Sequence, residues 1–270
     1  MVDFSIISIL LGGIVGFILA LTGAGGAILS VPLLVFGMHL SIVQAAPIGL
    51  LAIFLSATIG AFLGFREKIL RYKAASLMAS CGLILSPIGL FTAHKIPNTP
   101  LTIIFSIVLS YVAIKMLWQS TLEIKGVKPK AHQLPPCVLD QNIGKFTWTA
   151  PCARALAISG SLAGFFSGLL GVGGGFIIVP SLKKQTDLTI SSIVVTSLGV
   201  LAIVSLGGVI AATVSGNMNW TIGSLFSLGS LTGMLIGKQF AKKIAGPRLQ
   251  QLFGIFALCI AISMTYKVIR

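Results

Sequence analysis

The fold of this chain is decided by a glycine cluster inside an apolar segment, Gly171-Val172-Gly173-Gly174-Gly175-Phe176-Ile177-Ile178-Val179-Pro180. A glycine in a helix interior costs about 1 kcal/mol relative to alanine, so three in a row predict a break in the helix. At membrane depth, a break leaves backbone N–H and C=O groups without partners unless it lies inside protein or lines a wet cavity. We therefore interpret this break as a functional feature.

The same pattern occurs 148 positions earlier as Gly23-Ala24-Gly25-Gly26-Ala27-Ile28-Leu29-Ser30-Val31-Pro32. The offset of 148 also relates several further pairs, namely Gly12/Gly160, Gly16/Gly164, Leu40/Leu188, Gly89/Gly237 and Phe105/Phe253. Gly49 matches Gly199 at an offset of 150, which predicts a local slip of two residues. The chain is therefore predicted to be an internal duplication.

The composition assigns the chain to the membrane. It is 56% hydrophobic and 9% charged with a mean hydropathy of +1.03, whereas a soluble protein carries about 25% charged residues. The net charge of +14 is explained by basic loops that flank membrane segments, and recognisable nucleic-acid motifs are absent from the sequence. The start, Met1-Val2-Asp3-Phe4, lacks the basic region of a signal peptide, so we expect the first apolar segment to be retained.

The duplicated element G-x-G-G-x-x-x-x-V-P, near the start of each half of a small membrane protein, resembles the TauE/SafE family of anion exporters. The resemblance covers nearly the whole chain except the central loop. It implies a multi-pass protein of the bacterial cytoplasmic (inner) membrane that exports small sulfur-containing anions such as sulfite or organosulfonates. The first copy departs from the richer pattern, because Ala24 and Ala27 stand where the second copy has Val172 and Gly175.

We expect an all-α polytopic membrane protein with two homologous four-segment repeats, each with a glycine-broken first segment. The first repeat is predicted at 1–118, a cytoplasmic connecting loop at 119–150, and the second repeat at 151–270. The apolar segments are expected at about 4–36, 41–65, 74–93, 101–118, 153–182, 189–214, 220–237 and 249–266.

The distribution of Lys and Arg discriminates between two topologies. If every segment crosses once from a cytoplasmic N-terminus, 12 of the 19 basic residues lie inside. If segments one and five return to the side they enter, 16 lie inside and only Lys95, Lys267 and Arg270 stay outside. The positive-inside rule favours the second arrangement, which makes the halves inverted repeats. Eight simple spans, with parallel halves, are the alternative.

Each glycine turn is a candidate anion site. A half-helix that begins after the turn has N-terminal N–H groups without intrahelical partners and a partial positive charge. The candidate binding residues are Gly23, Gly25, Gly26 and Ala27 at the first turn, Gly171, Gly173, Gly174 and Gly175 at the second, and Gln44, Thr196 and Ser197 in the segments that follow. A purely structural kink is the alternative. Small residues at four-residue spacing are interpreted as helix-packing residues, namely Gly12, Gly16, Ala20, Gly160, Gly164 and Gly168.

The sequence does not predict an intramembrane proton relay, catalysis or a metal site. The carboxylates lie outside the predicted spans, which argues against an intramembrane proton relay; they are Asp3, Glu67, Glu123, Asp140 and Asp187. The sequence has no H-E-x-x-H, G-x-S-x-G or Walker A motif, so we expect neither an enzyme nor a cofactor. Cys137 and Cys152 flank the central loop and could pair or bind a metal with His132, but we expect free thiols and no metal.

We therefore predict a secondary transporter, embedded in the lipid bilayer, whose substrate is a small anion. An accessory membrane subunit that binds a partner through the central loop, without transport activity of its own, is the alternative. The coupling ion and the oligomeric state stay open.

Overall fold

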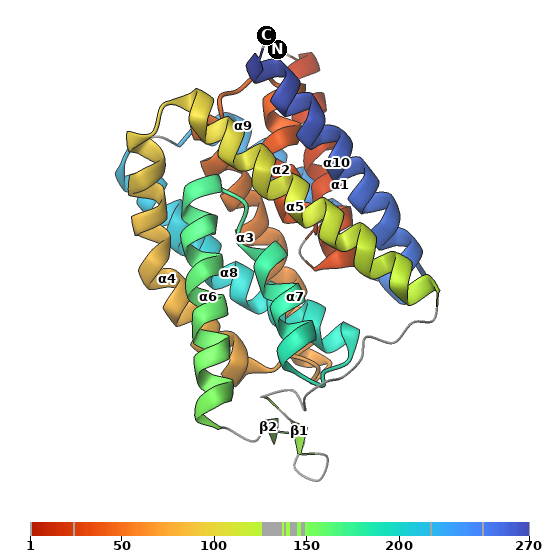
Figure 1. Cartoon of the computed structure of the whole chain (residues 1–270). Coiled ribbons are helices and arrows are strands. Elements are labelled where there is room, and N and C mark those ends of the chain that lie inside the picture. Colours follow the sequence, from red (N-terminus) through yellow and green to blue (C-terminus); the bar gives the residue numbers. More distant parts are fainter. Residues whose placement is uncertain are drawn as a thin grey trace.

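A computed structural model describes residues 2–23, 25–125, 137, 139–140, 145–146, 149–216, 218–244 and 246–269. Within these residues the chain forms ten helices (Figure 1), which are α1 Val2–Thr22, α2 Gly25–Gly37, α3 Ile42–Arg66, α4 Tyr72–Lys95, α5 Asn98–Ile124, α6 Ala150–Leu170, α7 Gly175–Gln185, α8 Ile190–Val214, α9 Trp220–Ile244 and α10 Pro247–Ile269. Two short strands in the connecting segment, β1 Leu139–Asp140 and β2 Lys145–Phe146, pair antiparallel.

Eight of the described helices are long and apolar enough to cross a membrane, and α2 and α7 are shorter. At about 1.5 Å per residue, α2 and α7 reach only part of the way through a hydrocarbon core of about 30 Å. The expected all-α polytopic fold is confirmed. Ten helices replace eight segments because the glycine clusters divide the first and the fifth.

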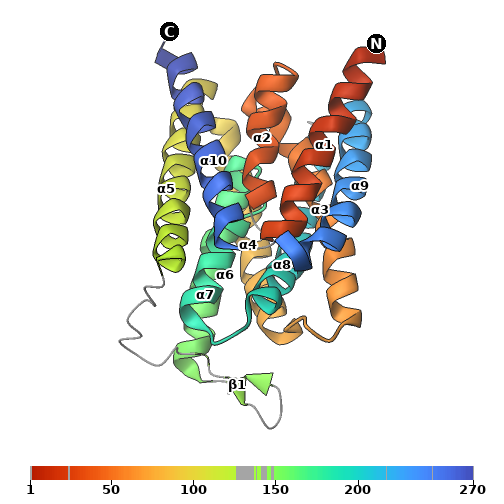
Figure 2. The same cartoon turned by 90° about the vertical axis from the view of Figure 1, so that its right-hand side faces the viewer.

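The divided segments form two helical hairpins. In Figure 2, α2 turns back toward the end of the bundle where α1 begins, beside both termini. The helix α7 turns back toward the opposite end, where α6 begins near β1. The half-helices α2 and α7 contact each other, and Ile28 and Phe176 belong to one buried apolar cluster. The two hairpins therefore enter the bundle from opposite ends and meet inside it.

Small residues allow the outer helices to pack closely against their neighbours. The helix α1 packs on α9, where a β-carbon on Gly12 or Gly16 would lie about 2 Å from a carbonyl oxygen, at 2.0 Å from Phe226 and 1.9 Å from Ser230. The helix α6 packs on α4 in the same way through Gly160, Gly164 and Gly168. Since only glycine permits such backbone approach, the predicted packing role of these residues is confirmed.

The central helices α3 and α8 contact each other, and each begins and ends 148 positions from the other. Their N-caps, Ser41 and Thr189, keep the same offset. The slip of two residues predicted from Gly49 and Gly199 is therefore wrong. The slip rests on the identical pairs Gly49/Gly199, Ala52/Ala202 and Ile53/Ile203, whereas the helix bounds place Ser197 opposite Gly49, 148 positions later.

At one end of the bundle, polar contacts join the ends of α3, α5, α8, α9 and α10 to one another or to neighbouring loops. The Lys238 ammonium lies 3.0 Å from the Glu67 carboxylate, which joins α9 to the end of α3. The Gln251 amide donates to the Thr121 hydroxyl at 3.1 Å, which joins α10 to α5. The Ser192 hydroxyl donates to the Ile69 carbonyl at 2.8 Å, which joins the start of α8 to the α3–α4 loop. We call this region the basic end, because most of the basic loops lie there.

The expectation of free thiols at Cys137 and Cys152 is wrong, because the two residues form a disulfide at the basic end. The Cys137 N–H donates to the Gln185 carbonyl at 3.1 Å, so the connecting segment folds against the end of α7. This fold brings the two α-carbons within 4.9 Å, a proximity that spacing alone does not reveal. His132 lies outside the described residues, within which no cluster of metal-ligating side chains occurs.

Candidate functional site

The second glycine turn joins α6 to α7 with a left-handed backbone. Gly171, Gly173 and Gly174 have φ values of +71°, +69° and +71°. A β-carbon would lie 2.2 Å from the Ala46 side chain at Gly171, and 2.3 Å from the Ala163 carbonyl oxygen at Gly174. Glycine is therefore required here for conformation and for space. Gly174 is the N-cap of α7. Because glycine has no side chain, no side-chain oxygen of the N-cap accepts the first N–H groups of this half-helix.

The first glycine turn joins α1 to α2 differently. Gly23 has φ +69° and donates its N–H to the Leu19 carbonyl at 2.8 Å. The Thr22 hydroxyl accepts the Gly25 N–H at 2.8 Å and donates to the Ile18 carbonyl at 2.8 Å. A side chain thus caps the start of α2, while the corresponding position before the second turn is Leu170. Ala24 lies outside the described residues.

The central helix α8 contacts the first glycine turn at Ser197, and α3 contacts the second at Gly49, the equivalent position 148 residues earlier. The Ser197 hydroxyl on α8 donates to the Gly23 carbonyl at 3.2 Å, while a β-carbon at Gly49 on α3 would lie 3.4 Å from the Gly171 carbonyl oxygen. Ser205 on α8 is fully buried, and its hydroxyl lies 3.2 Å from the β-carbon position of Gly173. Within the described part of the chain this hydroxyl has no hydrogen-bond partner. The second turn therefore has an uncapped helix start and a buried hydroxyl beside it.

The remaining predicted residues divide into two groups. Gly26, Ala27 and Gly175 are buried in the first turns of α2 and α7. Gln44 and Thr196 lie elsewhere: Gln44 is exposed in a capping box with Ser41 at the start of α3, and the Thr196 hydroxyl accepts the Arg71 N–H at 3.2 Å near the basic end. The structure therefore brings Ser197 to a glycine turn, whereas Gln44 caps its own helix and Thr196, in the second turn of α8, contacts the start of α4.

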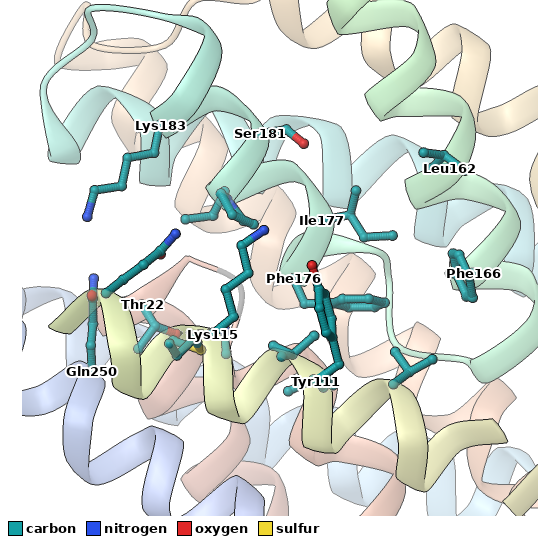
Figure 3. Close-up of a pocket in the computed structure, with 18 of the residues that line it drawn as sticks. Thr22, Tyr111, Lys115, Leu162, Phe166, Phe176, Ile177, Ser181, Lys183 and Gln250 are labelled. Atoms are coloured by element: carbon teal, nitrogen blue, oxygen red, sulfur yellow. Dashed lines mark hydrogen bonds between the residues drawn. The ribbon is translucent and has the colours of Figure 1, made fainter. Parts of the chain in front are cut away.

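A cavity of about 520 Å³ lies between α5 and α7, next to the first glycine turn and the start of α7. Thr22 and Gly25 line it from the first turn, and Phe176 and Ile177 line it from the first residues of α7. Figure 3 shows the side chains around it. Its polar lining residues were missed from the sequence, namely Tyr111, Lys115, Gln119, Ser181, Lys183 and Gln250. Lys115 could have been found, because it is a lysine inside the apolar range 101–118.

Two lysines line this cavity, and among the described residues only one of them has an acidic partner. Lys183 forms an ion pair with Glu123, which lies in the last turn of α5. The predicted absence of carboxylates from the spans is wrong at this residue, because α5 runs six residues beyond the expected end at 118. The Lys115 ammonium lies 5.7 Å from the centre of the Tyr111 ring, and no carboxylate of the described residues pairs with it. The cavity therefore retains one positive charge.

Within the described ranges, eight helices long and apolar enough to span a membrane, with two broken-helix hairpins that meet among them, define a multi-pass integral membrane protein of the transporter class. The sequence profile described as "Sulfite exporter TauE/SafE" matches residues 8–264, so the chain belongs to this family.

Relatives along nearly the whole chain carry transporter names. A "Probable membrane transporter protein" of Xylella fastidiosa (strain Temecula1) is 28% identical and covers 97% of this chain and 95% of its own. The "Probable membrane transporter protein YunE" of Bacillus subtilis is 23% identical, with 97% of each chain covered. A "Probable membrane transporter protein" of Haemophilus influenzae is 24% identical over 99% of this chain and 100% of its own.

Proposed function

We propose that this protein is a secondary transporter that exports small sulfur-containing anions, such as sulfite or organosulfonates, and that the second glycine turn binds the anion. The observation that carries the proposal is the uncapped start of α7 beside the buried Ser205 hydroxyl. Backbone N–H groups at a helix start favour an anion without a charged side chain, and the hydroxyl adds one further donor. The description of the family supports a sulfur oxyanion as the substrate.

We further propose that residues 1–118 and 151–270 are inverted repeats joined by a cytoplasmic segment. The hairpins from opposite ends support this proposal, as do the paired contacts of α1 with α9 and of α6 with α4. Transporters of this architecture expose a central site alternately to the two sides as one half moves against the other. The basic end would raise the local concentration of anions on the cytoplasmic side, which suits export.

The proposal is tested by flux measurements on the purified protein in liposomes. We expect a sulfite gradient to drive sulfite across the membrane when no other protein is present, and protein-free liposomes provide the control. An accessory subunit would give no flux until a partner is added. Absence of flux for sulfite and for organosulfonates, with correctly folded protein in the membrane, would overturn the proposal.

A further inference from the structure

We propose that the cavity between α5 and α7 binds an organic anion, with the charged head group at Lys115 and an apolar body along α5 and α6. This inference rests on the proposed transport function. It adds a second site, separate from the second glycine turn, and the residue that holds the head group there. Neither follows from the glycine turns, which provide an anion site with no preference for what the anion carries.

The size of the cavity argues for an organic ligand. Its volume of about 520 Å³ lies within the range of roughly 300–1,000 Å³ that is typical of small-molecule sites. A water molecule occupies about 30 Å³ in the liquid. A sulfite ion, which is only a few times larger than water, would leave most of the cavity unfilled. An anion with several carbon atoms would fill far more of it.

The lining residues are arranged for a ligand with two unlike ends. Figure 3 shows Lys183 and Gln250 on one side of the cavity and Leu162 and Phe166 on the other, with Lys115 between them. A charged head group would meet ammonium and amide donors on the first side. A hydrocarbon body would bury apolar surface on the second, which is favourable by about 25 cal/mol per Å².

Electrostatics select Lys115 as the residue that holds the head group. Glu123 already neutralises Lys183, whereas within the described residues no carboxylate pairs with Lys115. A lysine on a membrane-spanning helix is costly and is typically matched by a partner or a substrate. One monoanion at Lys115 would bring the cavity to neutrality. The adjacent Tyr111 side chain also lines the cavity and offers a hydroxyl donor.

A lipid chain is the competing occupant, because the cavity opens at the surface of the bundle. Ile107 and Tyr111, which line it from α5, are 62% and 64% exposed. A lipid or detergent chain would need the apolar wall but not the charge of Lys115. The two occupants can therefore be separated by removing the charge while the length of the side chain is kept.

The experiment measures binding of hexanesulfonate to the full-length protein in nanodiscs of neutral lipid, with hexanol and sulfite as competitors. We expect Lys115→Met to weaken hexanesulfonate binding by at least about tenfold, since a hydrogen bond to a charged group is lost. Lys115→Arg should retain most of the affinity. Lys184→Met, an exposed neighbour at the same end that does not line the cavity, should change nothing. Hexanol, which lacks the charge, should compete poorly.

A second variant tests the apolar end independently. Leu162→Trp should weaken hexanesulfonate binding but leave binding of the shorter ethanesulfonate unchanged, because only the longer body reaches this wall. Equal hexanesulfonate binding by the wild type and Lys115→Met, or equal competition by hexanol, would show an apolar groove and overturn the inference. Sulfite flux in liposomes without hexanesulfonate binding would overturn this inference alone. Lys115-dependent binding without flux of any anion would instead overturn the proposed function.

Discussion

The two glycine turns follow the same sequence pattern, yet they differ in how their half-helices begin. At the first turn, Thr22 caps the start of α2 with its hydroxyl. At the second, Gly174 caps α7 without a side chain, and Ser205 lies beside the turn with an unpaired hydroxyl among the described residues. A duplicated motif therefore need not give two equal sites. The first copy is capped by its own chain, and we propose that the second keeps its donors for a ligand.

The largest effect is expected from adding a methyl group to each turn. Gly171→Ala should lower the free energy of unfolding by about 2–5 kcal/mol, from left-handed strain of ~1–2 and overlap with Ala46 of ~1–3. Gly23→Ala should cost less, because the added carbon would lie 2.9 Å from the Val194 side chain and 3.0 Å from its α-carbon, a smaller overlap than that with Ala46. Thermal unfolding in detergent would measure both variants.

Gly216→Ala provides the control for strain alone, because Gly216 has φ +69° with nothing within 4 Å of the added carbon. Its cost should be about 1–2 kcal/mol. Equal costs at Gly171, Gly23 and Gly216 would contradict the claim that packing against Ala46 fixes the second turn.

The disulfide distinguishes the hairpins further, because it ties the start of α6 to the segment that pairs with the end of α7. Reduction of the purified protein, or Cys152→Ser, should lower stability by about 3 kcal/mol, as expected for a closed loop of 15 residues. The unfolding temperature with and without reductant measures this effect. Cys81→Ser, at a free cysteine, is the control. A reductant-insensitive melting temperature would show that the bond contributes little to the second hairpin.

A smaller pair of effects should separate capping from binding. Thr22→Val should cost about 1 kcal/mol of stability through the lost cap and leave sulfite affinity unchanged. Ser205→Ala should leave stability within about 0.5 kcal/mol but weaken sulfite binding by about fivefold. Calorimetric titration and melting curves on both variants give the two readouts. The reverse pattern would assign the ligand to the first turn.

Much of the fold could be predicted because its determinants are local. The glycine clusters mark both helix breaks, and the four-residue spacing of Gly12 and Gly16 identifies the face of α1 that packs closely. The disulfide and the cavity could not be predicted, because each depends on which distant segments meet. Cys137 reaches Cys152 only because its segment pairs with the end of α7, and the cavity exists only because residues of α5 and α7 line it from two sides.

The same limit explains the two predicted site residues that lie elsewhere. Gln44 and Thr196 come early in the segments after the turns, yet the Gln44 side chain accepts the Ser41 N–H at the start of its own helix, and the Thr196 hydroxyl accepts the backbone N–H of Arg71 at the start of α4. The Gln44 contact is a local cap of the kind common in the first turn of a helix, whereas the Arg71 partner of Thr196 comes from a segment 125 residues away. Sequence position alone distinguishes neither role from substrate binding. Ser197 was selected on the same grounds, and it reaches Gly23 because α8 passes the first turn.

The central claim is that the anion binds the uncapped start of α7 and not the capped start of α2. Amide resonances of protein labelled with ¹⁵N-glycine, recorded in nanodiscs during a sulfite titration, test it most directly. We predict saturable shifts for Gly174 and Gly175, with Gly25 and Gly26 unchanged, because Thr22 already occupies the Gly25 N–H. Shifts at Gly25 and Gly26 equal to those at Gly174 and Gly175, or no shift at either turn in protein that transports sulfite, would contradict the account.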